Sequence, residues 1–260
     1  MLEKPLNTRQ AAILKLIEQN GAATIEELET NFDVTPQTLR RDLNMLADAN
    51  LIQRFHGGAS AAPSLSTHNV PYQDRQIHHL REKEAIAKEI ARLIPDHSSL
   101  FINIGTTTET IAQALMQHHG LQIVTNNLHV ASLMSQKEDF RVIVTSGEVR
   151  AKDGGIVGEA TTEFVKQFRL DFGIIGISAI DDDGTLLDYD YREVRVAQAI
   201  IEHSRQVFLA ADHSKFGRRA MVRLGSLTQA NRFFTDRVPS PEIVELMQES
   251  NVALHLCPAL

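Results

Sequence analysis

The stretch TPQTLRRDLN, residues 35–44, decides how the first part of this chain folds. Thr35 is a favourable N-cap, and Pro36 suits the first position of a helix because its ring presets a helical backbone angle. The apolar side chains that follow recur on one face at helical spacing, at Leu39, Leu43 and Leu46. With these leucines turned inward, the opposite face carries mainly polar and basic side chains. The stretch therefore predicts an amphipathic helix with a donor-rich outer surface.

Two shorter helices are predicted before this one. The first ends at an Asn-Gly pair, residues 20–21, and has an apolar stripe at Ile13, Leu16 and Ile17. At the start of the second, Thr24 and Glu27 fit a capping box, in which a hydroxyl and a carboxylate each accept a backbone amide of the other residue. Three helices in this succession predict a helix-turn-helix whose third helix points at DNA bases.

A β-hairpin wing is predicted directly after the third helix. Residues 51–55, LIQRF, alternate in polarity, and the glycines at 57–58 suit the tip. Arginine grips guanine through two hydrogen bonds, glutamine and asparagine suit adenine, and hydroxyls suit phosphate. The predicted DNA contacts on the helix and the wing are Thr35, Gln37, Thr38, Arg40, Arg41, Asn44, Arg54 and His56. An alternative interpretation of the arginine pair is a solvated helix face.

Composition limits what this chain can be. With 260 residues, 43% of them apolar, it has material for one large core and one small one. Its net charge of -7 argues against a protein that coats nucleic acid through bulk positive charge, so DNA contacts must form a local patch. Because the sequence has neither a membrane-length apolar run nor a secretory signal, we expect a soluble, cytoplasmic protein. The single cysteine, Cys257, excludes a disulfide framework and a cysteine-based metal site.

A tether is predicted between two domains. Residues 60–71, SAAPSLSTHNVP, are small and polar, contain prolines and have no hydrophobic period. We therefore expect a winged helix-turn-helix domain at 1–59, a linker at 60–71 and a larger domain at 72–260. The larger domain is expected to begin with one long helix over residues 72–94, whose apolar side is Ile77, Ile86, Ile90 and Leu93.

The second domain alternates short apolar runs with helical segments, which is the pattern of a mostly parallel sheet covered by helices on both faces. The predicted strands are LFINI, LQIVTN, RVIVTS, FGIIGIS, QVFLAAD, RFFTD and VALHLC. Helices such as TETIAQALM, EVRVAQAII and PEIVELMQ lie between several of them. The fold class is therefore α/β. Ligands of such sheets bind in the crevice at the carboxyl ends of the strands, so polar strand ends are the candidate site.

The first polar strand end, IGTTTE, precedes a helix. Glycine lets the backbone approach a ligand, and successive amides with hydroxyls at a helix N-terminus form an anion site. A phosphate group fits such a site well. The alternative is an ordinary helix start, in which Thr106 and Glu109 form a capping box.

Three further strand ends are also polar. Asn126 and Asn127 suit the hydroxyls of a ligand, although a helix cap is an equal alternative. Carboxylates crowd residues 181–190 and Glu193, where an Asp-Gly pair favours a turn over a metal site. Lys215 is a counter-charge for phosphate, or else a surface lysine. The predicted ligand contacts are Gly105, Thr106, Thr107, Thr108, Asn126, Glu193 and Lys215. The ligand is expected to be a small phosphorylated metabolite.

No metal ion or cofactor is predicted. Two pairs of adjacent histidines occur, at residues 78–79 and 118–119. Neighbours on a helix point about 100° apart and cannot chelate one ion, so neither pair indicates a metal site.

The first sixty residues resemble the helix-turn-helix of the DeoR family of repressors. The residues that carry the likeness are Arg9, Ile13, Ile17, Thr35, Thr38, Leu39, Arg40, Arg41, Asp42 and Leu43, followed by HGGA at 56–59. The resemblance implies a transcription repressor that binds double-stranded operator DNA.

Most of residues 72–257 resembles the sensor and oligomerisation domain of the same family, which is related to ribose-5-phosphate isomerase. The likeness rests on IGTTTE, on REV at 192–194 and on DHSK, which ends at Lys215. Where the isomerase has an Asp-Gly-Ala-Asp catalytic segment, this chain has Gly-Ile-Ser-Ala at 176–179, so the general-base carboxylates are missing. The resemblance implies binding without turnover, and therefore no catalytic residue. The alternative is a sugar-phosphate isomerase or deaminase with an appended helical domain.

Within this family, the likeness across the whole chain is greatest to a repressor of glycerol metabolism. It is carried by TPQTLRRDLN, RFHGGA, FINIGTTTE, IVTNNL, GGIVGEAT, QFRLDFGIIGIS and ADHSKFGR. The resemblance implies glycerol 3-phosphate as the inducer and a homo-oligomer, a dimer or tetramer, on paired operator half-sites. A DeoR-type repressor that responds to another sugar phosphate, or an activator, remains the alternative.

Overall fold

The computed structural model describes residues 6–20, 22–49, 51–55, 57–61 and 69–259. The chain divides into two compact units, residues 1–65 and 66–260. Each unit has a hydrophobic core of its own. No helix in the described ranges is long and apolar enough to cross a membrane.

In the described part of the first unit, three helices pack on a three-stranded antiparallel sheet. Its elements are α1 (Thr8–Asn20), β1 (Ala22–Thr24), α2 (Ile25–Phe32), α3 (Pro36–Asp48), β2 (Ile52–Phe55) and β3 (Gly58–Ala61). Both hydrogen bonds of the predicted capping box form, from Glu27 N to Thr24 Oγ1 and from Thr24 N to Glu27 Oε2. The predicted apolar stripes meet in the core, where the fully buried side chains are Ile13, Ile17, Leu28, Leu39, Leu43 and Leu46. The prediction of three helices followed by a hairpin is confirmed.

The first strand of this sheet was not predicted. β1 has three residues and pairs with β3, with Ala23 opposite Ala59 and Thr24 opposite Gly58. A Cβ atom on Gly58 would lie 2.4 Å from the carbonyl oxygen of Ala23, which no side chain tolerates. Glycine at this position therefore does more than form a turn, because it lets β1 close against the hairpin.

The second unit is built on a sheet of seven parallel strands in the order β15-β14-β12-β9-β4-β5-β6. Their bounds are β4 (Ser99–Ile102), β5 (Gln122–Thr125), β6 (Arg141–Val144), β9 (Leu170–Gly176), β12 (Ser204–Ala210), β14 (Arg232–Thr235) and β15 (Ala253–Leu256). Each strand overlaps one of the seven predicted apolar runs, so the predicted α/β fold is confirmed.

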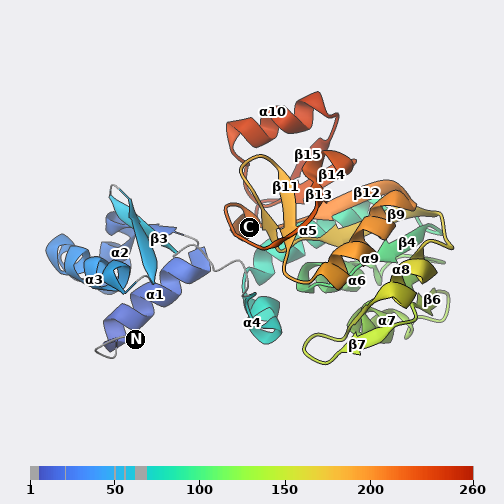
Figure 1. Cartoon of the computed structure of the whole chain (residues 1–260), viewed down its shortest axis with the longest axis horizontal. Helices are drawn as coiled ribbons and strands as arrows, with labels where there is room; N and C mark the ends of the chain where they lie inside the picture. Colours follow the sequence, from blue (N-terminus) through green and yellow to red (C-terminus); the bar gives the residue numbers. More distant parts are fainter. Residues whose placement is uncertain (1–5, 21, 50, 56, 62–68, 260) are drawn as a thin grey trace. The chain divides into compact units, whose positions relative to one another are not determined.

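Helices cover both faces of this sheet (Figure 1). Consecutive strand residues point to opposite faces, so Ile174 joins one core and Ile175 the other. The core that contains Ile174 is completed by α5 (Leu80–Leu93), α6 (Thr106–Leu115) and α7 (Leu128–Met134). The opposite core is completed by α8 (Glu159–Val165), α9 (Tyr191–Glu202) and α10 (Pro241–Glu249).

The single long helix expected over residues 72–94 is wrong. The segment forms α4 (Tyr72–Ile77) and α5, and His79 between them has a left-handed backbone with φ 55°. The buried ammonium of Lys83 donates to the backbone carbonyls of Arg75 and His78, so it takes the acceptors that a continuous helix would use internally. Ile77 is 69% exposed rather than part of the apolar side.

Two smaller sheets extend from the strand ends. β10 (Ala179–Ile180), β11 (Thr185–Asp188) and β13 (Val222–Ser226) form one, and β7 (Glu148–Arg150) with β8 (Gly155–Val157) forms the other. The turn predicted at Asp183-Gly184 joins β10 to β11, and Gly184 has φ 78° there. Two 3-10 turns, η1 (His213–Lys215) and η2 (Leu227–Gln229), follow β12 and β13.

Candidate functional site

The outer surface of α3 is polar and exposed. Gln37, Arg40 and Arg41 all project from the fold. The hydroxyls of Thr35 and Thr38 instead lie 3.0 Å apart, and Thr35 Oγ1 also accepts the backbone amide of Thr38 as the N-cap. Two of the predicted DNA contacts therefore shape the start of the helix, and the three longer side chains form its accessible donor surface.

Arg54 on β2 braces the hairpin against α3. Its Nη1 donates to the side-chain oxygen of Asn44 and, at 3.4 Å, to the carbonyl of Arg40. Its Nε donates to the carbonyl of Gly58 across the hairpin at 3.2 Å. Two predicted DNA contacts, Arg54 and Asn44, thus bond to one another. The remaining one, His56, lies outside the described residues.

The aspartate that follows the arginine pair has a structural role. Asp42 is 4% exposed, and its two oxygens accept hydrogen bonds from Arg9 Nε at 2.7 Å and Gln10 Nε2 at 2.9 Å. These bonds join α1 to α3 and keep the carboxylate away from the exposed donor surface. A carboxylate pointing outward there would repel DNA phosphates, so its inward position leaves the surface positive.

The predicted ligand contacts gather where the parallel strands end. Gly105 has φ 145° and is the N-cap of α6, without a side-chain cap. The alternative capping box of Thr106 with Glu109 is therefore wrong. Thr106 and Thr107 are buried in the first turn, whereas the Thr108 hydroxyl donates to the carbonyl of Asn103 at 2.7 Å. The first turn of α6 thus has backbone amides that no side chain caps.

Two asparagines follow β5 and have different tasks. Asn127 is the N-cap of α7, and its amide also donates to Glu109 Oε1 at 3.0 Å. Asn126 donates to the carbonyl of Ile156 at 3.1 Å, but its own Oδ1 is buried without a hydrogen-bond partner among the described residues. A buried acceptor without a partner is costly, so Asn126 Oδ1 is suited to accept a hydroxyl from a ligand.

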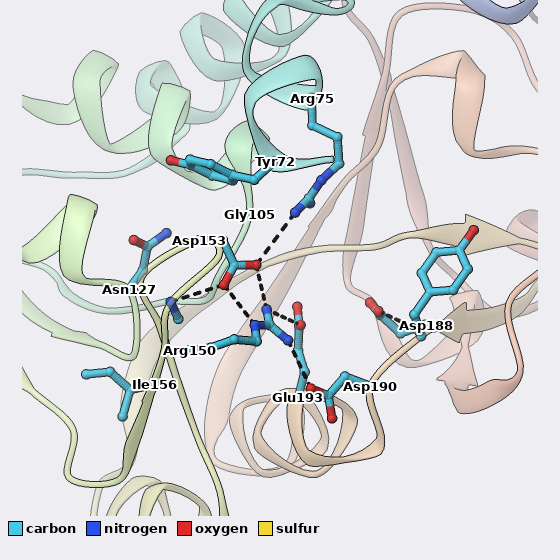
Figure 2. Close-up of polar contacts among 12 residues, drawn as sticks. Tyr72, Arg75, Gly105, Asn127, Arg150, Asp153, Ile156, Asp188, Asp190 and Glu193 are labelled. Carbon is cyan, nitrogen blue, oxygen red and sulfur yellow. Dashed lines mark hydrogen bonds and ion pairs between the residues drawn. The ribbon is translucent and has the colours of Figure 1, made fainter. Parts of the chain in front are cut away.

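Arg150 on β7 holds three carboxylates together (Figure 2). Its Nη2 lies 2.8 Å from Asp153 Oδ2 and 2.7 Å from Glu193 Oε2, and its Nη1 lies 3.1 Å from Asp190 Oδ2. Burial opposes the charge of Arg150, but the carboxylates raise its pKa above the ordinary value. Two further arginines share these carboxylates, since Arg192 pairs with Asp190 and Arg75 with Asp153.

Even so, Glu193 is not fully ionised at neutral pH. Burial first, and then the carboxylate of Asp188, raise the pKa of Glu193 to about 7. Burial also raises the pKa of Asp188. Near neutral pH, Glu193 is therefore able to donate or accept a hydrogen bond.

The short helix α4 reaches this cluster from the other side (Figure 2). The Tyr72 hydroxyl donates to Glu109 Oε2 at 2.8 Å, and Arg75 Nη2 lies 3.6 Å from Asp153 Oδ2. Because Glu109 belongs to the first turn of α6, α4 contacts the same turn that carries the predicted anion site.

Lys215 lies in η1 after β12 and is half-buried. No hydrogen bond or ion pair within 4 Å joins its ammonium to another described residue. Burial lowers the pKa of Lys215, and burial together with Lys215 lowers the pKa of Lys83 to about 8. The carboxylate of Asp212 acts on both ammonium groups, but neither ammonium forms an ion pair within 4 Å among the described residues, so both remain able to attract an anion.

The sequence did not predict four residues that surround the candidate site. These are Tyr72, Lys83, Arg150 and Asp153, whereas Asp188 lies in the carboxylate-rich stretch 181–190 noted from the sequence. Arg150 and Glu193 are 43 positions apart in the sequence, and Tyr72 and Glu109 are 37 positions apart. No local sequence pattern therefore predicts these contacts. The REV segment at 192–194 did indicate Glu193 itself.

Comparison with known proteins gives two family matches. Residues 9–64 match the DeoR-like helix-turn-helix domain, and residues 78–237 match the DeoR C terminal sensor domain. The chain is 53% identical over 249 residues to the glycerol-3-phosphate regulon repressor of Escherichia coli (strain K12), covering 96% of this chain and 98% of that protein. It is 55% identical over 249 residues to the protein of the same name from Haemophilus influenzae, covering 96% of each.

A solved structure of ribose 5 phosphate isomerase A from Neisseria gonorrhoeae is also similar. The TM-score is 0.38 at 15% identity, over 58% of this chain and 57% of that chain. A likeness this weak supports no conclusion about activity.

Proposed function

Because this chain belongs to the DeoR family of transcriptional regulators, we propose that its larger unit binds glycerol 3-phosphate and that this ligand releases operator DNA. The chain is a DNA-binding transcriptional repressor of glycerol metabolism and not an enzyme. We also propose that residues 60–71, the first two of which belong to β3, tether the two units. A repressor acts on the chromosome, so the proposed compartment is the cytoplasm.

The first turn of α6 supports a phosphate site more than any other feature. Gly105 lets the ligand approach the backbone, and the amides of this turn lack a capping side chain. The helix dipole favours negative charge at this end, and Lys215 offers an ammonium without an ion-pair partner among the described residues. A phosphate bound here would accept hydrogen bonds from the amides and from the hydroxyls of Thr106 and Thr107.

The polar groups beyond this turn suit a short polyol. Asn126 Oδ1 is a buried acceptor without a partner among the described residues, so a hydroxyl of the ligand would satisfy it. Glu193, with a pKa of about 7, is available as donor or acceptor for a second hydroxyl. Glycerol 3-phosphate carries one phosphate and two hydroxyls, which matches one anion site flanked by two hydrogen-bonding groups.

Induction is proposed to act through α4. A phosphate at the first turn of α6 would repel Glu109 and attract Arg75, and these residues take part in the bonds that hold α4 in place. α4 follows the tether to the first unit directly in the sequence. A ligand shifts such an equilibrium only by binding its two states unequally, and unequal contacts with α4 would provide that difference.

DNA binding is proposed to use α3 in the major groove. Gln37, Arg40 and Arg41 would contact base edges or phosphates, with the wing beside them. One such unit reads a short half-site, so we propose a homodimer or homotetramer on paired half-sites of the operator.

The decisive experiment measures operator affinity of the full chain by fluorescence anisotropy, with and without glycerol 3-phosphate. We expect glycerol 3-phosphate to weaken binding, and glycerol, inorganic phosphate, ribose 5-phosphate and fructose 6-phosphate to do so much less. A stronger response to another sugar phosphate would refute the proposed inducer and leave the DNA-binding role intact. Binding that no phosphorylated metabolite changes would refute the sensor role.

A further inference from the structure

A cluster of two histidines and one aspartate joins the start of α5 to the start of η1 and has no part in the proposed sensing. His79, Asp212 and His213 each offer one ligand atom, and these atoms all lie within 4.8 Å of one another. The imidazole rings of the two histidines meet edge to face, with centroids 4.9 Å apart. We propose that these three residues bind a divalent transition metal ion of the Zn²⁺ type.

Two atoms of the cluster are buried without a hydrogen-bond partner among the described residues, Asp212 Oδ2 and His213 Nε2. Asp212 is fully buried, and its other oxygen, Oδ1, accepts hydrogen bonds from the backbone and hydroxyl of Ser214. Leaving an anionic oxygen and a ring nitrogen unpaired is costly. One metal ion would use both lone pairs at once.

The surroundings of His213 prepare it as a ligand. Its Nδ1 lies 2.6 Å from Asp236 Oδ2, and its backbone amide donates to Asp236 Oδ1 at 2.6 Å. A carboxylate at Nδ1 holds the proton on that nitrogen and directs the lone pair of Nε2 outward. This arrangement, in which a carboxylate orients a histidine that binds metal, recurs in protein metal sites.

The break between α4 and α5 brings the third ligand into place. In a continuous helix the side chains of His78 and His79 would point about 100° apart, and no break would turn either ring toward His213. The left-handed backbone of His79 turns its ring toward His213 instead. The expectation that the histidine pair has no metal-binding role rested on a helix that does not form at this point.

The donor set selects the class of ion. Mg²⁺ and Ca²⁺ prefer oxygen ligands, whereas two imidazole nitrogens with one carboxylate suit Zn²⁺, Co²⁺ or Ni²⁺. Two ligands bonded to one such ion at about 2.0–2.2 Å lie at most about 4.4 Å apart, so a small rotation of a side chain completes the site. The carboxylate of Asp212 also offsets the positive charge of nearby Lys215.

Such an ion would join the start of α5 to the end of β12. We expect the untagged full chain, stripped with a chelator, to take up one Zn²⁺ or Co²⁺ per chain in nondenaturing mass spectrometry. Added Zn²⁺ should raise the thermal midpoint, since an ion that binds only the folded state stabilises it, and added Mg²⁺ should not.

Variants separate this site from adventitious binding. His79→Ala and His213→Ala should lose the ion, and Asp236→Asn should weaken binding by about 10- to 100-fold. The matched control is His78→Ala, which changes the adjacent histidine and should bind as the parent does. Asp212→Asn keeps the Oδ1 acceptor and tests the site even if a histidine variant does not fold.

Failure of the parent protein to retain Zn²⁺ or Co²⁺ overturns the proposal. So does uptake that is the same in folded His79→Ala, His213→Ala and Asp212→Asn. These measurements involve neither DNA nor glycerol 3-phosphate, so their failure leaves the proposed function untouched.

Discussion

The guanidinium of Arg54 donates a hydrogen bond to the side-chain oxygen of Asn44, and this bond ties the wing to the helix proposed to enter the major groove. Both residues were predicted as separate DNA contacts. Their contact instead makes the position of the wing depend on α3. A protein that binds DNA with two elements gains from fixing their relative position before binding, because less freedom is then lost in the complex.

The first prediction tests this bond. Arg54→Ala and Asn44→Ala should each lower operator affinity, and the double variant should lose less than the product of the two single losses, because both remove the same brace. Fluorescence anisotropy with the four proteins completes the cycle. Strictly multiplicative losses would indicate that the two side chains contact DNA independently.

The second prediction concerns the exposed arginine pair. Arg41→Ala should weaken operator binding by about 1–3 kcal/mol if its guanidinium reads a base, and the loss should depend on the operator sequence. Lys15→Ala, which removes an exposed positive charge from α1, is the matched control and should have little effect. An operator affinity that Arg41→Ala leaves unchanged would contradict the proposed DNA surface.

The third prediction tests the anion site. Lys215→Ala and Thr107→Val should lower the affinity for glycerol 3-phosphate by about tenfold or more, as expected when a hydrogen bond to a charged group is lost. Operator binding without inducer should remain. Isothermal titration calorimetry measures the ligand, with Lys88→Ala on the exposed side of α5 as control. Unchanged ligand affinity in both variants would place the phosphate elsewhere.

The fourth prediction concerns α4. Tyr72→Phe removes the hydrogen bond to Glu109, so the ratio of operator affinities without and with inducer should fall severalfold, while the ligand still binds. Tyr191→Phe, at an exposed tyrosine on α9, is the control. A Tyr72→Phe protein that responds to inducer as the parent does would show that the signal leaves the cleft by another route.

The fifth prediction follows from Glu193. Its pKa is raised from 4.5 to about 7 in the folded protein, so the folded state holds a proton that the unfolded state releases in this range. The contribution of Glu193 to stability is therefore present below about pH 4.5 and is lost as pH rises through about 7. Glu193→Gln should remove this loss, so the variant should gain stability relative to the parent as pH rises.

Calorimetry of both proteins across this pH range gives the difference in thermal midpoint. Glu163→Gln, at an exposed glutamate on α8, should track the parent at every pH. A difference between Glu193→Gln and the parent that does not change with pH would mean that the pKa of Glu193 is the same in the folded and unfolded states.

The sequence predicted those parts of the molecule that depend on neighbours in the chain. The leucine stripe of α3, the capping box at Thr24 and the apolar strands are local patterns, and each corresponds to an observed element. The sequence also indicated that polar residues after several strands lie near one another, because parallel strands place their carboxyl ends at one edge of the sheet.

Features set by distant contacts did not follow. The sequence around residue 79 does not indicate a helix break, because the ammonium of Lys83 donates to the carbonyls of Arg75 and His78 only in the folded chain. Arg150 was not predicted as a site residue because its carboxylate partners at 190 and 193 are 40 or more positions away. The burial of Asp42 did not follow either, because its partners Arg9 and Gln10 are 32 or more positions away in the sequence.

The helix break at His79 also limits how much of the protein would have to move when a ligand binds at the strand ends. A single helix over residues 72–94 would be about 34 Å long. Tilting its first turns would also move the part that packs on the sheet. Divided in two, the chain keeps the longer piece anchored in the core, whereas the six-residue piece buries none of its residues and is held by the bonds of Tyr72 and Arg75. A change in the position of α4 could then reach the tether without repacking the hydrophobic core.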